Sequence, residues 1–332
     1  MPDAEATERN MIRIVFMGTP DFAAVMLKAL AESGSYEIAA AITQPDKPKG
    51  RGYALSESPV KQYARQCGIP VLQPKSCKGE EFYAELTRLS PDMIIVAAYG
   101  KILPSGVIHY PRLGCINVHG SLLPAYRGAA PIQRAILNGE TETGITIMHM
   151  DEGIDTGDML GKAVVPITDA DSFGTLHDRL AQAGAELLIR TLPSVIDGTA
   201  VAEKQPETGA SYAHKIEKAD CVLDFTCSAR QVFNRIRGLS PFPLAAAVCR
   251  GAVLKIPAAE CKKETGCHGK PGEVLSLEGG KILVACGTGA VSVTEVLPAG
   301  KKRMSASDFI NGRKIQVGDI LTSPQDSTTG GK

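Results

Sequence analysis

Strand-like and helix-like segments alternate between residues 11 and 170, and this alternation restricts the possible folds more than any other feature. The runs MIRIVFMG (11–18), YEIAAAITQ (36–44) and PDMIIVAAYG (91–100) are almost continuously apolar, as strands covered on both faces are. The segment 21–34 has a helical period, begins with Asp and ends with Gly. The pattern predicts an α/β fold in which helices cover both faces of a Rossmann-like, mostly parallel sheet.

The pattern of apolar and polar residues changes in the last part of the chain. After a long predicted helix (172–198), the polar stretch TAVAEKQPETGAS is typical of a linker. Short alternating apolar runs with glycine turns then predict a small OB-like antiparallel β-barrel. The expected division is a disordered N-terminus (1–10), an α/β domain (11–198), a linker (199–211), an OB-like domain (212–318) and a polar tail (319–332).

Charge is balanced over the whole chain but not within it. Lys and Arg total 36, as do Asp and Glu, yet residues 211–320 contain 16 Lys and Arg against 10 Asp and Glu. A basic C-terminal part favours a polyanionic partner there. The alternative is a basic surface that only water contacts.

The cysteines indicate neither a disulfide framework nor a metal site. Nine are present at irregular spacing and none forms a CxxC pair. The one local Cys/His cluster, CKKETGCH (261–268), lacks a second ligand pair, so we expect no metal. Reduced thiols are typical of a cytoplasmic protein. No apolar run reaches the roughly 18–20 residues that span a membrane, and the acidic residues among the first ten argue against a secretory signal or transit peptide.

Two common nucleotide motifs are missing from the sequence. There is no GxxxxGK[ST], and the first predicted strand continues into FMGTPDF, with one glycine where a dinucleotide fold requires three. We therefore expect an α/β domain that does not bind NAD or ATP in the usual way.

The stretch GCINVHGSLLP (114–124) contains the first candidate site. Asn117 and His119 are two positions apart in a predicted strand, so their side chains point to the same face, at the carboxyl end where ligands bind in parallel sheets. An amide beside an imidazole can stabilise an oxyanion, and histidine can move a proton near neutral pH. The alternative is a polar strand end with a satisfied histidine.

A carboxylate could complete this pair. DEGIDTGDML supplies Asp151, Glu152, Asp155 and Asp158 after another predicted strand, and one of them could orient His119. The turn-like DTGD favours an inward Asp155, but the chemistry alone does not choose between Asp155 and Asp151. Other histidines have weaker settings, and His149, in an apolar run, is expected to be structural.

The segment 43–61 is too long for a simple connection. It carries Lys47, Lys49, Arg51 and Lys61 among prolines and glycines. A flexible basic loop beside a strand end favours contacts with phosphates. A solvated loop is the alternative.

These residues together resemble a known family. The motifs MGTPDFA, TQPDKPKGRG, SPVK, AYGKILP, LGCINVHGSLLPAYRGAAPIQRAI, GITIMHMDEGIDTGDML and PAGKKRMSASDFINGR are similar, in order and spacing, to those of the folate-dependent formyltransferases, and specifically to the methionyl-tRNA formyltransferases. The resemblance covers roughly residues 11–315.

The resemblance implies transfer of the formyl group of 10-formyltetrahydrofolate to the α-amine of methionyl initiator tRNA, for translation initiation. It makes Asn117, His119 and Asp155 the catalytic residues, with no metal or nucleotide cofactor. It assigns tetrahydrofolate contacts to Ser121, Leu122, Leu123 and Pro124, the pterin pocket to backbone near 97–100, and tRNA contacts to Lys47, Lys49 and Arg51. We expect a monomer.

Two departures from the family pattern stand out. Tyr53 and Ala54 follow GRG where the family commonly has two lysines, which thins the charge of the loop, and Phe242 occupies a position where tryptophan is frequent. Rival interpretations are a formyltransferase for glycinamide ribotide or an amino sugar, a formyltetrahydrofolate hydrolase, and a non-catalytic RNA-binding protein. The basic segments argue against the first two, and the Asn117–His119–Asp155 set argues against the third.

Overall fold

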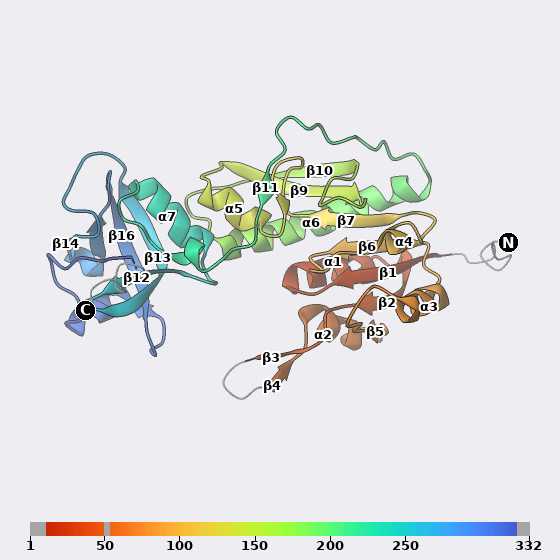
Figure 1. The fold of residues 1–332 in the computed structure, drawn as a ribbon, viewed down its shortest axis with the longest axis horizontal. Coiled ribbons are helices and arrows are strands. Elements are labelled where there is room, and N and C mark those ends of the chain that lie inside the picture. Colours follow the sequence, from red (N-terminus) through yellow and green to blue (C-terminus); the bar gives the residue numbers. More distant parts are fainter. Residues whose placement is uncertain (1–10, 50–53, 324–332) are drawn as a thin grey trace. The chain divides into compact units, whose positions relative to one another are not determined.

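A computed structural model describes residues 11–49 and 54–323 (Figure 1). The expectations for residues 1–10, for Arg51 and for residues 324–332 lie outside this range. The chain divides into two compact units. The first contains residues up to 129, 143–166 and 177–213, and the second contains 130–142, 167–176 and the residues from 214 onward. The domain bounds expected from the sequence stay a prediction.

The first unit is built on a seven-stranded sheet in the order β10-β9-β7-β6-β1-β2-β5. Its pairs β1–β2, β1–β6, β6–β7 and β2–β5 are parallel, and β7–β9 is antiparallel. The predicted mostly parallel sheet is confirmed. The strands are β1 (Ile12–Gly18), β2 (Tyr36–Ile42), β5 (Val71–Leu72), β6 (Met93–Ala97), β7 (Cys115–His119), β9 (Glu142–His149) and β10 (Met159–Pro166).

Helices pack against the sheet, and its central strands are buried on both faces. Every residue of β6 and β7 is buried. The helices are α1 (Asp21–Glu32), α2 (Pro59–Gln66), α3 (Glu80–Leu89), α4 (Ser105–Ile108) and α6 (Phe173–Ile196). The start of α2 is fixed by the Ser58 side chain, which accepts a hydrogen bond from Lys61 N, and by proline at the first helical position.

One close approach sets the direction of the side chains on β7. A Cβ on Gly184 of α6 would lie 2.8 Å from the terminal methyl of Met26 in α1 and 3.3 Å from Val118 of β7, so α6 packs closely against both elements at this glycine. Val118 therefore points to the face that α1 and α6 cover. Asn117 and His119, its neighbours in the strand, point to the opposite face.

Two small strand pairs complete the first unit. The basic segment forms a hairpin in which β3 (Lys47–Lys49) pairs antiparallel with β4 (Ala54–Ser56), where the sequence suggested a flexible loop. Farther along, β8 (Arg127–Gly128) pairs in parallel with β11 (Tyr212–Ala213). This second pair brings residues that precede the second unit beside the segment that follows β7.

The second unit contains a curled antiparallel sheet in the order β12-β13-β16-β15-β14, with β17 beside β16, as predicted. Register shifts between β13 and β16 are bulges of the kind that bend a sheet. The elements are α5 (Pro131–Leu137), a 3-10 turn (Ala219–Cys221), α7 (Ala229–Gly238), β12 (Ala245–Cys249), β13 (Ala252–Lys263), β14 (Val274–Ser276), a second 3-10 turn (Glu278–Gly280), β15 (Ile282–Ala285), β16 (Ala290–Pro298), β17 (Met304–Ser305) and α8 (Ala306–Asn311).

Helix α7 packs on this sheet and also against α5. It begins with a capping box between Ser228 and Gln231. Polar ties join the earlier segments to the rest of the unit: Arg134 of α5 pairs with Asp220 at 2.7 Å, and Arg237 donates to Thr168 O at 2.6 Å. Within the part of the chain that the structure describes, no helix is long and apolar enough to cross a membrane.

Candidate active site

Asn117 and His119 lie near the end of β7 and are almost fully covered, at 9% and 6% exposed. Asp155, from the loop between β9 and β10, lies against both. Asn117 Nδ2 donates to Asp155 Oδ1 at 3.3 Å, and His119 Nδ1 lies 3.6 Å from Asp155 Oδ2. The backbone N–H of Gly128 donates to the same Oδ2 at 2.8 Å. One carboxylate therefore ties together the strand end, the β8 segment and its own loop.

The other acidic residues of this loop have different partners. Both carboxylate oxygens of Asp151 accept from Thr156 Oγ1, at 2.7 and 2.8 Å, so this residue stabilises the turn of the loop. Glu152 Oε1 contacts Ser105 Oγ and His109 Nε2, each at 2.8 Å, and hydrogen bonds, that with His109 first and that with Ser105 second, lower the pKa of Glu152 to about 2. Asp158 is exposed. Among the four acids, the geometry thus groups Asp155 with the pair on β7.

The second ring nitrogen of His119 has a backbone partner. Its Nε2 lies 2.9 Å from Tyr126 O, and because a carbonyl only accepts, the proton of this bond is on Nε2. Nδ1 then faces the Asp155 carboxylate. Tyr126 and Asp155 both have left-handed backbone angles, with φ of 62° and 54°. Neither contact from the Tyr126–Gly128 backbone is visible in the sequence, because backbone groups leave no residue-type signature.

The tetrahydrofolate segment predicted at 121–124 is a closed turn after β7. Ser121 Oγ donates to Ala125 O at 2.6 Å, and Leu123 N donates to Thr146 Oγ1 at 3.1 Å. Ser121 and Leu123 are buried, whereas Leu122 and Pro124 are half-buried. Thr146, which pairs with His119 across β7 and β9, also donates to Ser121 O at 2.8 Å. Thr146 was not among the residues predicted for the site, although it is a hydroxyl within the apolar run Ile145–Met148.

The cations of the basic hairpin have different environments. Lys47 is exposed, and its Nζ donates to Gln44 Oε1 at 3.1 Å. Lys61 is instead half-buried at the base of the hairpin, 2.5 Å from Asp46 Oδ2 and 2.9 Å from Gln73 Oε1. The hydrogen bond between Lys61 and Asp46 lowers the pKa of the acid and raises the pKa of the amine. Lys61 therefore anchors the hairpin, whereas Lys47 is available to a ligand.

Comparison with protein families shows the family to which this chain belongs. A family model described as formyl transferase matches residues 11–192, and one described as formyl transferase, C-terminal domain, matches residues 215–314. The chain belongs to the formyl transferase family. Methionyl-tRNA formyltransferase of Aromatoleum aromaticum is 49% identical over 93% of this chain and 96% of that protein. The enzyme of the same name from Bacillus subtilis is 47% identical over 94% and 98%. The predicted family resemblance is confirmed.

Solved structures agree with this formyl transferase in fold. The sugar 3N-formyl transferase WlaRD, solved with dTDP and 5-N-formyl-THF, has a TM-score of 0.62 at 19% identity and covers 89% of this chain and 100% of that one. HypX from Aquifex aeolicus, in complex with tetrahydrofolic acid, has a TM-score of 0.63 at 18% identity and covers 94% of this chain and 51% of its own.

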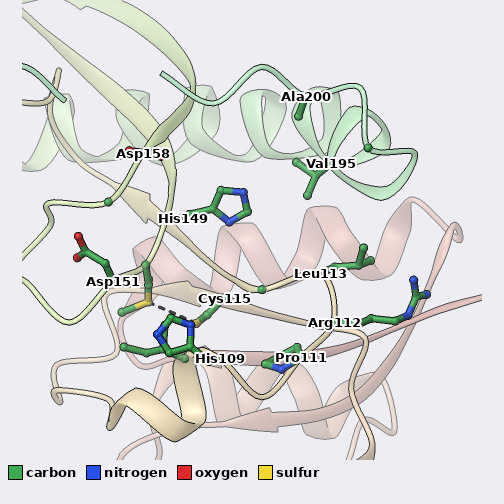
Figure 2. A pocket seen from close by; sticks show the side chains of 15 residues that line it. His109, Pro111, Arg112, Leu113, Cys115, His149, Asp151, Asp158, Val195 and Ala200 are labelled. Atoms are coloured by element: carbon green, nitrogen blue, oxygen red, sulfur yellow. Dashed lines mark hydrogen bonds between the residues drawn. The ribbon is translucent and has the colours of Figure 1, made fainter. Parts of the chain in front are cut away.

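The formyl transferase also contains a large pocket, lined by residues other than Asn117, His119 and Asp155 (Figure 2). Its volume is about 690 Å³, and it lies where β7 begins and β9 ends, between Cys115, His149 and the end of α6 at Val195. The predicted catalytic residues do not line it. Burial lowers the pKa of His149, and the nearby Asp158 carboxylate opposes this effect. His149 therefore favours its neutral form in the folded protein.

We predict that His149 weakens the fold in acid. Its pKa is lowered on folding, so below its ordinary value of ~6.5 the unfolded chain binds more protons at this site than the folded chain, and stability falls as pH drops. Urea unfolding between about pH 7 and pH 5 should show a shallower loss of stability for His149→Gln than for the unmodified protein. His214→Gln, at an exposed histidine, is the control. Equal pH slopes for His149→Gln and the unmodified protein would contradict the prediction.

Proposed function

We propose that this formyl transferase moves the formyl group of 10-formyltetrahydrofolate to the α-amine of methionyl initiator tRNA, giving N-formylmethionyl-tRNA for translation initiation. The observation that carries the proposal is the convergence of Asn117, His119 and Asp155 at the end of β7, in a chain whose relatives over 93% of its length are methionyl-tRNA formyltransferases. The folate enters as a co-substrate. We expect the protein to work as a cytoplasmic monomer.

The chemistry follows from a carbonyl attacked by an amine. The methionyl nitrogen bonds to the formyl carbon, and the carbonyl electron pair moves to oxygen. Collapse of this intermediate breaks the bond to the folate nitrogen, which receives a proton as the amine loses one. The charge on oxygen is the feature that the enzyme must stabilise, because it grows toward the transition state.

Asn117 is suited to this stabilisation. A carboxamide has two N–H donors, and one of them is given to Asp155 Oδ1. The other remains for the substrate oxygen, from an amide whose orientation the carboxylate fixes. His119 lies on the same face of β7, with its ring nitrogens toward Asp155 and Tyr126 O, so we assign it an electrostatic part in stabilising this oxygen rather than a free N–H. Fixed donors of this kind lower a barrier because they need no reorganisation during the reaction.

Asp155 orients the two groups and takes part in proton movement. It contacts the His119 ring at 3.6 Å and accepts from Gly128 N at 2.8 Å, so its carboxylate cannot turn away without losing a backbone hydrogen bond. We propose that it relays the amine proton, directly or through water. Leu122 and Pro124, which are only half-buried, are the members of the 121–124 turn that we assign to folate contact.

Two features favour a tRNA acceptor over a sugar or ribotide. The hairpin β3–β4 carries Lys47 and Lys49, and Arg51 belongs to the same segment outside the described residues. Residues 211–320 are rich in Lys and Arg. Backbone phosphates of a nucleic acid are the ligand that such cations bind.

The acceptor can be tested directly. We expect purified protein with 10-formyltetrahydrofolate and charged initiator tRNA to produce formylmethionine, measured after hydrolysis of the ester. Methionine alone, an amino sugar and glycinamide ribotide serve as competing acceptors in parallel reactions. Formylation of one of these small amines without any product on tRNA would sink the tRNA proposal and leave the formyl transfer chemistry in place.

Asn117→Ala should lose about 100-fold to 1,000-fold in kcat, because it removes an oxyanion donor. Binding of charged tRNA, measured by filter retention, should persist, since no phosphate contact is changed. Asn311→Ala, at an exposed asparagine of α8, is the matched control. Near-normal turnover of Asn117→Ala would refute the oxyanion role.

Lys47→Ala should weaken tRNA binding at low salt and reduce the slope of log K against log salt by about 0.7 to 0.9, the value of one phosphate contact. Lys28→Ala removes another exposed lysine, from α1, and controls for total charge. A slope unchanged by Lys47→Ala would exclude a phosphate contact at this residue.

A further inference from the structure

The segment 203–213, called here the strap, follows α6, includes β11 and ends where the second unit begins (Figure 1). Its composition is that of a linker, yet it contains one side chain out of keeping with its neighbours. Gln205 is 6% exposed, whereas the other residues from 201 to 209 are all exposed. A polar side chain buried in this way must be held by hydrogen bonds, because an unsatisfied buried amide is costly.

The partners of Gln205 belong to β8 and to the loop between β9 and β10 that carries Asp155. Its Nε2 donates to Asp155 O at 2.8 Å and to Gly157 O at 2.8 Å. Its Oε1 accepts from Arg127 Nε at 3.0 Å, and Arg127 is itself 3% exposed. Both N–H groups and the oxygen of the amide are thus used, and the amide cannot rotate without losing two contacts to the loop.

Asp155 needs such a contact. Its φ of 54° is left-handed, a conformation that is uncommon for residues with a Cβ and that aspartate adopts more readily than most of them. Glycine would relieve the strain, but glycine has no carboxylate for Asn117 and His119. By bonding to the carbonyls of residues 155 and 157, Gln205 holds the turn on both sides of its middle residue.

A second strap residue acts on the other side of His119. Ser211 Oγ accepts from Tyr126 N at 2.9 Å, and Ser211 O accepts from Arg127 N at 2.9 Å. The carbonyl of Tyr126, whose φ of 62° is also left-handed, is the group 2.9 Å from His119 Nε2. Both partners of the His119 ring are therefore strained residues that contact the strap.

We propose that Gln205 and Ser211 are positioning residues of the active site: through Asp155 and Tyr126 they fix the orientation of the His119 ring. The proposal rests on the catalytic role proposed above for His119 and Asp155. Neither strap residue has to touch a substrate. Their contribution is to geometry, where displacement of a reacting group by about 1 Å can cost on the order of 100-fold in rate.

The test uses Gln205→Met, which keeps the length of the side chain and removes its hydrogen bonds. We expect kcat for formylation of charged tRNA to fall about 10-fold to 100-fold, while the KM for tRNA changes little because no tRNA contact is lost. Lys204→Met, at the exposed neighbour in the strap, is the matched control and should keep the kcat of the unmodified protein. Ser211→Ala should lower kcat in the same way.

An NMR measurement separates positioning from a loss of stability and from failure of the function itself. The ring signals of His119 should shift in Gln205→Met and not in Lys204→Met, at a temperature where thermal melting shows both variants folded. Unchanged His119 signals together with unchanged kcat in Gln205→Met would overturn the proposal while the formylation assay of the unmodified protein still succeeds. If the unmodified protein formylates no acceptor, the function proposed above fails instead, and unchanged His119 signals then overturn the positioning by themselves.

Discussion

The Asp155 carboxylate is the contact on which the geometry of the site depends. It accepts from Asn117 Nδ2 and Gly128 N and lies beside the ring of His119, so it joins three segments that are separate in sequence. The sheet makes this meeting possible. β7 is parallel to β6 and presents its side chains at a carboxyl end, and β9 runs antiparallel to β7, so the chain leaving β9 can fold back over the same face.

Packing on the opposite face of β7 holds Asn117 and His119 in place. Val118 packs against α6 at Gly184, where the absence of a side chain allows close contact. Because Val118 is held against α6, β7 cannot rotate Asn117 and His119 away from the loop that carries Asp155. Thr146 adds a second constraint, because its hydroxyl bridges Ser121 O and Leu123 N immediately after His119. Packing on one side and hydrogen bonds on the other therefore determine where the amide and the imidazole lie.

The sequence was sufficient for features that depend on periodicity. The apolar runs at 11–18 and 91–100 predicted buried parallel strands, and the alternation at Asn117 and His119 predicted side chains on one face. It was insufficient where a backbone group or a distant segment decides. The partner of His119 Nε2 is a carbonyl, at Tyr126, and any residue type has one. Lys61 and Lys47 belong to the same basic segment and are equivalent in the sequence. Only the structure reveals that the Lys61 amine is hydrogen-bonded to Asp46 and Gln73.

Gln205 illustrates the same limit more sharply, since its stretch has the composition of a linker and no periodicity. The physical reason for its burial lies 50 residues earlier, in a turn that must hold an aspartate in a glycine-like conformation. A loop that carried its own stabilising contacts would need side chains within it, and those of Asp151 and Thr156 already fix its opening turn. The left-handed backbone at Asp155 is instead stabilised by Gln205, from the strap that continues in sequence into the second unit. A polar stretch between two units can therefore be part of the active site of one of them, and its buried residue, rather than its composition, is what identifies it.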